Sequence, residues 1–126
     1  MKKILIAEDD TLLLRMYKRV FTHAGYEIVT ASNGQEAIEK VTHFKPHLIM
    51  TDVMMPKMTG LELLEKLKKN PRTAHIPVIF LTNLKAAHEI ENAHLKGAAR
   101  YIIKDENPPS QVLHIVDTFL KSTSTK

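Results

Sequence analysis

The sequence predicts a doubly wound α/β protein in which helices cover both faces of one parallel, five-stranded sheet. Short apolar runs and amphipathic segments alternate five times along the 126 residues, a pattern typical of consecutive strand–helix units with right-handed crossovers. Each run is short and rich in residues that favour strands, as expected when both faces of a sheet are buried. The expected strands are Lys3–Ala7, Glu27–Ala31, His47–Thr51, Val78–Thr82 and Tyr101–Ile103.

The amphipathic segments carry helix signals at their ends as well as apolar residues at helical spacing. Asp10 is suited to cap the first helix, Asn33-Gly34 opens the second, and Asn70-Pro71 stops the third. Among the strands, Glu27–Ala31 is the most polar, which predicts that it lies at an edge of the sheet. The residues expected to face the core are Leu13, Met16, Tyr17, Val20 and Phe21, then Ala37, Ile38 and Val41, then Leu61, Leu64 and Leu67, then Ala87, Ile90 and Ala93, and finally Val112, Leu113, Val116, Phe119 and Leu120.

The composition favours one globular domain and excludes several kinds of site. The chain has no cysteine, which rules out disulfides, thiolate metal sites and cysteine nucleophiles. The basic start is followed by too short an apolar run for a signal peptide or a membrane span, so we expect a cytoplasmic protein. The expected domain covers residues 1–121, residues 122–126 form a flexible polar tail, and no output domain is predicted.

Polar residues stand at the carboxyl ends of four of the expected strands. Because the carboxyl ends of parallel strands meet at one edge of the sheet, these side chains are expected to share one crevice at a topological switch point. The residues are Glu8, Asp9 and Asp10 after the first strand, Asp52 after the third, Thr82 at the end of the fourth and Lys104 after the fifth.

This set of side chains indicates phosphoryl chemistry that depends on Mg²⁺. Neighbouring carboxylates repel one another unless a cation neutralises them, and Mg²⁺ prefers oxygen ligands that include water and phosphate. A lysine supplies a point charge for phosphate. An aspartate can itself act as the nucleophile and form an aspartyl phosphate.

The sequence resembles the receiver domains of bacterial two-component response regulators, of the stand-alone kind that includes the chemotaxis receiver. The resemblance covers residues 3–120 and implies a flavodoxin-like (βα)5 fold with strand order 2-1-3-4-5. The motifs that carry it are Ile4-Leu5-Ile6-Ala7-Glu8-Asp9-Asp10, Pro46-His47-Leu48-Ile49-Met50-Thr51-Asp52-Val53-Met54-Met55-Pro56 with Gly60, Pro77-Val78-Ile79-Phe80-Leu81-Thr82, and Gly97-Ala98 through Tyr101-Ile102-Ile103-Lys104.

The resemblance implies a phosphoacceptor and a metal site. Asp52 matches the aspartate that takes a phosphoryl group from a sensor histidine kinase or a phosphotransfer protein. Asp9 and Asp52 match direct Mg²⁺ ligands, and Glu8 would hold the metal through water. The backbone carbonyl of Met54 would be a further ligand.

The resemblance also implies a conformational switch. Thr82 would hydrogen-bond the phosphoryl oxygen, Lys104 would pair with it, and Tyr101 matches the aromatic residue that turns inward when Thr82 moves. The fourth helix, fifth strand and fifth helix would then present a changed surface to a downstream protein. The basic residues expected near this surface, with the switch tyrosine, are Lys85, His88, Lys96, Tyr101 and Lys104.

Three departures from the family pattern concern the phosphate side of the crevice. Asp105 follows Lys104 where the family usually has proline, which predicts a trans peptide bond, an altered loop and a partial pull of Asp105 on Lys104. Asn83 replaces a smaller residue and is expected to crowd or hydrogen-bond the phosphoryl group. Met54 and Leu84 are both apolar. Together these features predict a comparatively long-lived phosphoryl group.

Two other classes of function remain open at this point. A pseudo-receiver, which would be a constitutive protein-interaction module without phosphoryl transfer, is compatible with Asn83 and Asp105. A nucleic-acid-binding protein is suggested by the net charge of +4 alone, but the basic residues are spread along helices rather than clustered. We therefore expect no direct DNA binding and no membrane association.

Overall fold

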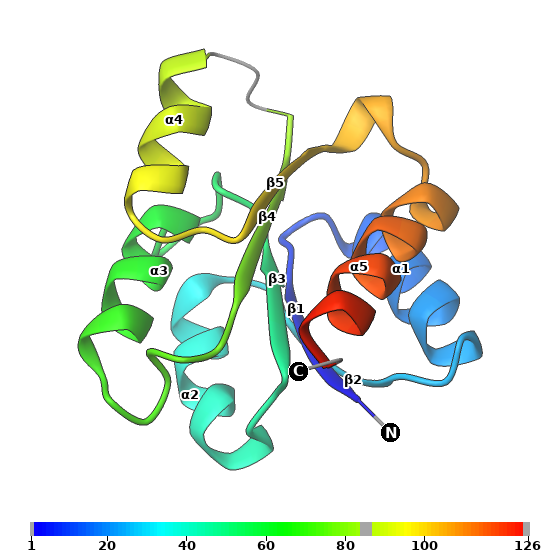
Figure 1. Cartoon of the computed structure of the whole chain (residues 1–126), viewed down its shortest axis with the longest axis horizontal. Coiled ribbons are helices and arrows are strands. Elements are labelled where there is room, and N and C mark those ends of the chain that lie inside the picture. The colour runs from blue at the N-terminus through cyan, green and yellow to red at the C-terminus, as the bar shows by residue number, and fades with distance from the viewer. Residues whose placement is uncertain (1, 84–86, 125–126) are drawn as a thin grey trace.

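The computed structural model describes residues 2–83 and 87–124 and contains a parallel sheet between two layers of helices (Figure 1). The strands lie in the order β2-β1-β3-β4-β5, which confirms the predicted doubly wound topology. The strands are β1 (Lys3–Ala7), β2 (Glu27–Ala31), β3 (Leu48–Thr51), β4 (Val78–Thr82) and β5 (Arg100–Ile103). The helices are α1 (Thr11–His23), α2 (Gly34–Phe44), α3 (Gly60–Lys69), α4 (Ala87–Leu95), the short 3-10 helix η1 (Lys104–Glu106) and α5 (Pro109–Ser124).

The two faces of the sheet bury separate apolar clusters. Helices α2, α3 and α4 cover one face, and α1 and α5 cover the other (Figure 1). Successive residues of each strand point to opposite faces, so Leu5 and Phe80 belong to the first cluster while Ile4 and Ile79 belong to the second. Burial on both sides explains why the central strands appear in the sequence as continuous apolar runs.

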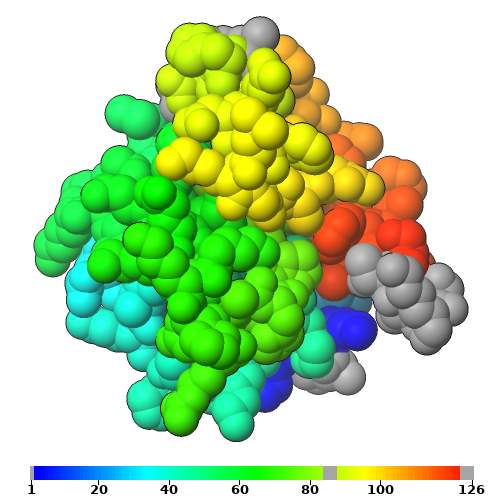
Figure 2. All heavy atoms as spheres, turned by 60° about the vertical axis from the view of Figure 1, so that its left-hand side comes forward, coloured from blue at the N-terminus to red at the C-terminus, as the bar shows by residue number. Residues whose placement is uncertain are grey.

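Figure 2 shows α3 and α4 side by side on the first of these faces. The Nζ atom of Lys96, just after α4, lies 3.2 Å from a carboxylate oxygen of Glu65 on α3. Gly97 has a positive φ of 106°, and a Cβ atom there would lie 3.1 Å from Cε of Lys68. The positive φ therefore favours the glycine that the sequence places there, whereas the flexible Lys68 side chain could move aside.

Local capping interactions begin the first three helices. The side chains of Asp10 and Asn33 accept hydrogen bonds from the backbone of Leu13 and Glu36 respectively, which confirms both sequence-based assignments. Helix α3 begins with a reciprocal capping box between Thr59 and Glu62. The spacing of these two residues is a recognised capping signature, so the start of α3 is also encoded locally in the sequence.

The end of α5 differs from the sequence expectation. The helix continues through Ser124, so residues 122–124 are helical where a polar tail was expected. An ion pair of 3.0 Å between Lys121 and Asp117 and a hydrogen bond from Ser122 to the carbonyl of Phe119 satisfy polar groups in its last turns. In the part of the chain that the structure describes, no helix has the length and apolar character needed to cross a membrane.

Candidate functional site

Strand register brings two carboxylates together at the carboxyl edge of the sheet. Ala7 of β1 pairs with Thr51 of β3, so the next residues, Glu8 and Asp52, leave adjacent strands side by side. The backbone amide of Asp52 donates to the carbonyl of Ala7 at 3.1 Å, which extends this register by one residue. Both side chains are nearly buried, with 2% of Glu8 and 7% of Asp52 exposed.

Asp9 completes the acidic cluster that the sequence predicted. Carboxylate oxygens of Glu8, Asp9 and Asp52 lie within 4.8 Å of one another, whereas Asp10 turns to the start of α1 as its cap. Asp9 is exposed while its two partners are buried, so the cluster opens to solvent on the Asp9 side. A hard divalent cation that keeps part of its water shell fits this set of oxygen ligands.

Lys104 joins the buried carboxylates across the sheet. Its Nζ atom lies 2.6 Å from Oε1 of Glu8 and 2.7 Å from Oδ2 of Asp52. Three carboxylates and one ammonium leave a formal charge of −2. In this structure the ammonium is held by the carboxylates of Glu8 and Asp52, and the expected pull of Asp105 on Lys104 in the phosphorylated state stays a prediction.

Burial and pairing shift the pKa values of Glu8 and Lys104. Burial raises the pKa of Glu8, although the hydrogen bond from Lys104 and the backbone amide of Asp10 oppose the increase. Burial alone would lower the pKa of Lys104, but its hydrogen bonds to Asp52 and Glu8 outweigh this effect and raise it. Lys104 consequently stays charged at neutral pH and is suited to neutralise a second anionic group in the crevice.

Thr82 and Tyr101 lie on the neighbouring strands β4 and β5. Thr82 pairs with Ile103, which places Thr82 beside the residue that precedes Lys104. Thr82 is almost completely buried, and Tyr101 is half-buried, with its ring edge-on to Phe80 at a centroid distance of 6.0 Å. The structure thus places Thr82 next to Lys104 at the carboxyl edge of the sheet. Tyr101 lies two residues before Ile103 on β5, the strand that pairs with β4.

The loop after β5 differs from the family pattern in a way that involves both unusual residues. Among the described residues no peptide bond is cis, so the expected trans bond between Lys104 and Asp105 is confirmed, and residues Lys104–Glu106 form a 3-10 turn. The backbone amide of Asp105 donates to Oδ1 of Asn83 at 2.8 Å. The pairing could not be deduced from sequence, because it depends on how closely the backbone of the loop after β5 approaches Asn83 in the folded protein.

The loop after Asp52 is fixed by a close contact with the start of α3. A Cβ atom at position 60 would lie 2.2 Å from the carbonyl oxygen of Asp52 and 2.9 Å from Cα of Val53. The amide of Gly60 donates to the carbonyl of Val53 at 2.8 Å. Within the same loop the amide of Met54 donates to Oδ1 of Asp52 at 3.2 Å, and the Met54 side chain is 60% exposed. Leu84, the second apolar residue expected near the crevice, lies outside the described residues, as does Lys85.

The parallel five-stranded α/β fold carries three carboxylates and a bridging lysine at its carboxyl edge, an arrangement that fits a signalling domain of the doubly wound class. Comparison of the sequence identifies the family. The sequence model of the response regulator receiver domain matches residues 4–117. The chain belongs to this family.

Two curated relatives show how the chain relates to longer and shorter family members. It is 40% identical over 103 residues to the transcriptional regulatory protein CrdR of Helicobacter pylori, which covers 82% of the chain and 48% of that protein. It is 32% identical over 108 residues to the polar-differentiation response regulator DivK of Brucella anthropi, which covers 86% of the chain and 88% of that protein. The chain thus spans about half the length of the first relative and most of the second.

Solved structures agree with the fold. A CheY-like receiver domain protein from Methanospirillum hungatei is 29% identical, with a TM-score of 0.89 over 99% of this chain and 98% of the other. The Mn²⁺-bound form of the response regulator Rcp1 is 25% identical, with a TM-score of 0.77 over 88% of this chain and 86% of the other. The similarity therefore extends over both layers of helices and all five strands.

Proposed function

We propose that this chain is a Mg²⁺-dependent receiver that accepts a phosphoryl group on Asp52 from a phosphohistidine of a sensor kinase or a phosphotransfer protein. The observation that carries the proposal is the meeting of three carboxylates and Lys104 at one point of the sheet edge. The Mn²⁺-bound relative supports a divalent cation at such a site. When bound, the metal would neutralise the carboxylates and share the phosphoryl oxygens.

The residues of the chain supply the remaining parts of the transfer. A carboxylate oxygen of Asp52 attacks phosphorus, the bond from phosphorus to the histidine nitrogen breaks, and that nitrogen regains a proton. Asp9 and Glu8 hold the cation, with the backbone carbonyl of Met54 as a further proposed ligand. Lys104 already contacts Asp52, so it needs only a small movement to pair with a phosphoryl oxygen on that side chain.

The donor has an open route to Asp52 on the side where the carboxylate cluster is exposed. Asp9 lies there, and two apolar side chains nearby in sequence, Leu12 and Met54, are 69% and 60% exposed. A protein donor that docks at this edge would cover these apolar side chains.

We infer that the signal leaves through α4, β5 and α5. A phosphoryl group adds about −1.5 to −2 charge, and Thr82 and Lys104 would move toward it while Tyr101 turns inward. A shift of the active conformation from 1% to 99% of the population needs about 5.5 kcal/mol of differential interaction. The two new contacts, from Thr82 and Lys104, are expected to supply only part of this free energy. Phosphorylation would then shift the population partly, and binding of the partner would complete the shift. The partner surface is less basic than expected from the sequence, since Lys104 points into the crevice, His88 pairs with Glu89, and Lys96 pairs with Glu65.

The central test is phosphorylation by a small donor. The protein is incubated with Mg²⁺ and acetyl phosphate and then analysed by mass spectrometry. We expect one added phosphoryl group in the wild type and in Glu91→Gln, a control on the exposed side of α4, and none in Asp52→Asn. No gain at any donor concentration would instead favour the pseudo-receiver, a constitutive interaction module.

A second measurement tests the lifetime that the unusual residues predict. The phosphorylated protein is freed of donor and followed by mass in the presence of Mg²⁺. We expect slow loss of the phosphoryl group, because the exposed side chain of Met54 is apolar and cannot orient a hydrolytic water by hydrogen bonding. A half-life of seconds would contradict this expectation while leaving phosphorylation itself intact.

A further inference from the structure

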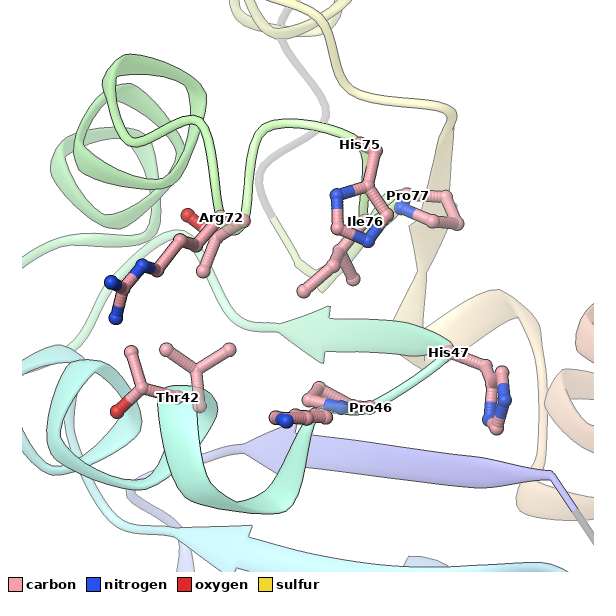
Figure 3. Close-up of a pocket in the computed structure, with 10 residues that line it drawn as sticks. Thr42, Pro46, His47, Arg72, His75, Ile76 and Pro77 are labelled. Atoms are coloured by element: carbon pink, nitrogen blue, oxygen red, sulfur yellow. The ribbon is translucent and has the colours of Figure 1, made fainter.

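A second concave site lies at the amino edge of the sheet, at the opposite end of β3 from Asp52. It is a pocket of about 610 Å³ between the end of α2, the start of β3 and the loop from α3 to β4. Figure 3 shows one wall formed by Arg72, His75, Ile76 and Pro77 and the other by Thr42, Pro46 and His47. The pocket has the volume of sites that hold small organic ligands, roughly 300–1,000 Å³.

The charged residues that line this pocket are all basic. Lys45 and Arg72 line it, and none of the described lining residues carries a carboxylate. A second depression shares Val41, Thr42 and Thr73 with it and adds Lys66 and Lys69. Within residues 2–83 and 87–124, none of these four cations has a carboxylate at ion-pair distance, although Glu62 lies close enough to Lys66 to feel its charge.

His47 adds a hydrogen-bonding group to the pocket more than it adds charge. Nδ1 of His47 accepts a hydrogen bond from the backbone amide of Lys3 at 3.0 Å. Burial and the nearby charges of Lys2, Lys3 and the amino terminus lower the pKa of His47. The ring is therefore neutral at pH 7, and the permanent positive charge of the pocket comes from Lys45 and Arg72.

The pocket is apolar at its base and held by backbone contacts. Three residues of its lining, Val41, Pro46 and Ile76, are apolar and buried, and this apolar part of the two walls is called the floor here. The loop that carries Arg72 is fixed by a hydrogen bond of 2.9 Å from its backbone amide to Oδ1 of Asn70, and the hydroxyl of Thr73 donates to the carbonyl of Leu67 at 2.8 Å. A ligand would therefore find the floor and the Arg72 loop already in place.

Lys45 occupies a conformation in which a side chain is unusual. It ends α2 with φ 52°, a left-handed conformation that glycine adopts without strain and other residues adopt at some cost. The lysine at this position places its charge at the rim of the pocket. This feature supports a functional reading of the pocket, since such strain tends to persist where a site needs the side chain.

We propose that this pocket binds a small organic phosphate with a flat apolar body, the class to which nucleoside diphosphates belong. The phosphates would pair with Lys45 and Arg72, and the flat body would lie on the apolar floor. The site is separate from the phosphorylation site, because its lining residues come from the amino ends of β3 and β4 and the acidic cluster lies at their carboxyl ends. The proposal is therefore independent of phosphoryl transfer to Asp52.

Calorimetric titration with ADP tests the proposal, in EDTA to keep divalent cations from the acidic cluster. Pyrophosphate and adenosine are titrated in parallel as the charged and apolar halves of the probe. We expect ADP to bind more tightly than either half, and its affinity to fall with added salt because the charge interactions are screened. Binding of pyrophosphate as tight as that of ADP would overturn the role of the apolar floor, and absence of ADP binding would overturn the proposal.

Variants locate the binding site. Lys45→Gln with Arg72→Gln should weaken ADP binding by at least about tenfold, since two charge-assisted contacts are lost. Lys18→Gln with Arg19→Gln removes the same charge from exposed positions of α1, on the other face of the sheet, and should leave the affinity within about twofold. Thr42→Glu, an exposed change that adds a carboxylate to the intact pocket, should weaken binding as well.

Three further outcomes would overturn the assignment. The first is an equal loss of ADP affinity in the pocket variants and in the α1 control. The second is ADP binding by Thr42→Glu that is as tight as that of the wild type. The third is binding of a short single-stranded oligonucleotide under conditions where ADP does not bind. Asp52→Asn should bind ADP as the wild type does. A failure to phosphorylate Asp52 and a failure to bind ADP are thus separate results.

Discussion

The side chain of Asn83 accepts a hydrogen bond of 2.8 Å from the backbone amide of Asp105. Asn83 follows Thr82 at the end of β4, and Asp105 follows Lys104 at the end of β5, so the bond joins the two loops that carry the phosphate-side residues. A proline at position 105 would have no amide hydrogen to donate. The two departures from the family pattern therefore act together in this chain.

Removal of the Asn83 side chain tests this link. Asn83→Ala should lower the free energy of unfolding by about 0.5–1 kcal/mol, the usual value of one partly exposed hydrogen bond, and amide hydrogen exchange at Asp105 should accelerate. Asn83→Asp keeps an acceptor oxygen and should retain most of the protection at Asp105. Equal exchange rates at Asp105 in wild type and Asn83→Ala would show that the bond is not formed in solution.

Replacement of Lys104 tests its bridge between Glu8 and Asp52. Lys104→Met removes the cation and leaves two nearly buried carboxylates close together, which we expect to cost about 2 kcal/mol of stability in EDTA. This value lies below that for breaking a fully buried pair, because the cluster opens to solvent at Asp9. Urea denaturation measures the loss.

Mg²⁺ should stabilise Lys104→Met more than it stabilises the wild type, because the metal then supplies the neutralising charge. Lys96→Met removes a lysine from an exposed ion pair with Glu65 and should change stability by less than about 1 kcal/mol. A Lys104→Met protein that is as stable as the wild type in EDTA would argue against the bridge.

Gly60→Ala tests the close approach between α3 and the loop after Asp52. Its Cβ atom would lie 2.2 Å from the carbonyl oxygen of Asp52, and backbone cannot rotate away as a side chain can. We expect a loss of about 3 kcal/mol or more, measured by thermal or urea unfolding. Gly25→Ala is the matched control, because position 25 has φ 101° and open space around its Cβ, so only the conformational cost of about 1–2 kcal/mol applies. Equal losses in the two variants would contradict the steric explanation.

Tyr26→Phe tests, through its pH dependence, a contact between the residue just before β2 and α5. The hydroxyl of Tyr26 donates to Oδ1 of Asp117 at 2.5 Å and lowers the pKa of Asp117, with a smaller contribution from Lys121. A carboxylate whose pKa is lower in the folded state stabilises the protein above its unfolded pKa, and this stability is lost as the pH falls through its folded pKa.

Tyr26→Phe should therefore cost about 1 kcal/mol at pH 7, a modest value because Asp117 is partly exposed. The difference from wild type should narrow below the ordinary pKa of aspartate. Urea denaturation from pH 7 to pH 3 measures this change. Asp117→Asn combined with Tyr26→Phe should show no such pH-dependent difference from Asp117→Asn alone, and a gap between wild type and Tyr26→Phe that stays constant with pH would contradict the assignment.

Much of the fold could be predicted because its signals are local in the sequence. The bounds of β1, β2 and β4 match the predicted bounds residue for residue, and Glu27–Ala31, the most polar of the expected strands, lies at an edge of the sheet as predicted. His47 lies just before β3, where its amide donates to the carbonyl of Lys3 at 2.8 Å. Helix α5 continues beyond residue 121, because polar residues alone do not end a helix whose preceding turn is still packed on the sheet.

The sequence by itself determined which residues stand at the carboxyl edge, because strand period and chain order place Glu8, Asp9 and Asp52 there. Only the tertiary structure decided which groups they meet. Lys104 reaches Glu8 from 96 residues away along the chain and Asp52 from 52 residues away, and Asn83 meets Asp105 from 22 residues away. Such contacts depend on strand register, loop backbone and the rotamers that packing allows, none of which is encoded in a local pattern. The basic pocket at the amino edge depends on tertiary structure for the same reason, since its walls come from segments that only the folded sheet brings together.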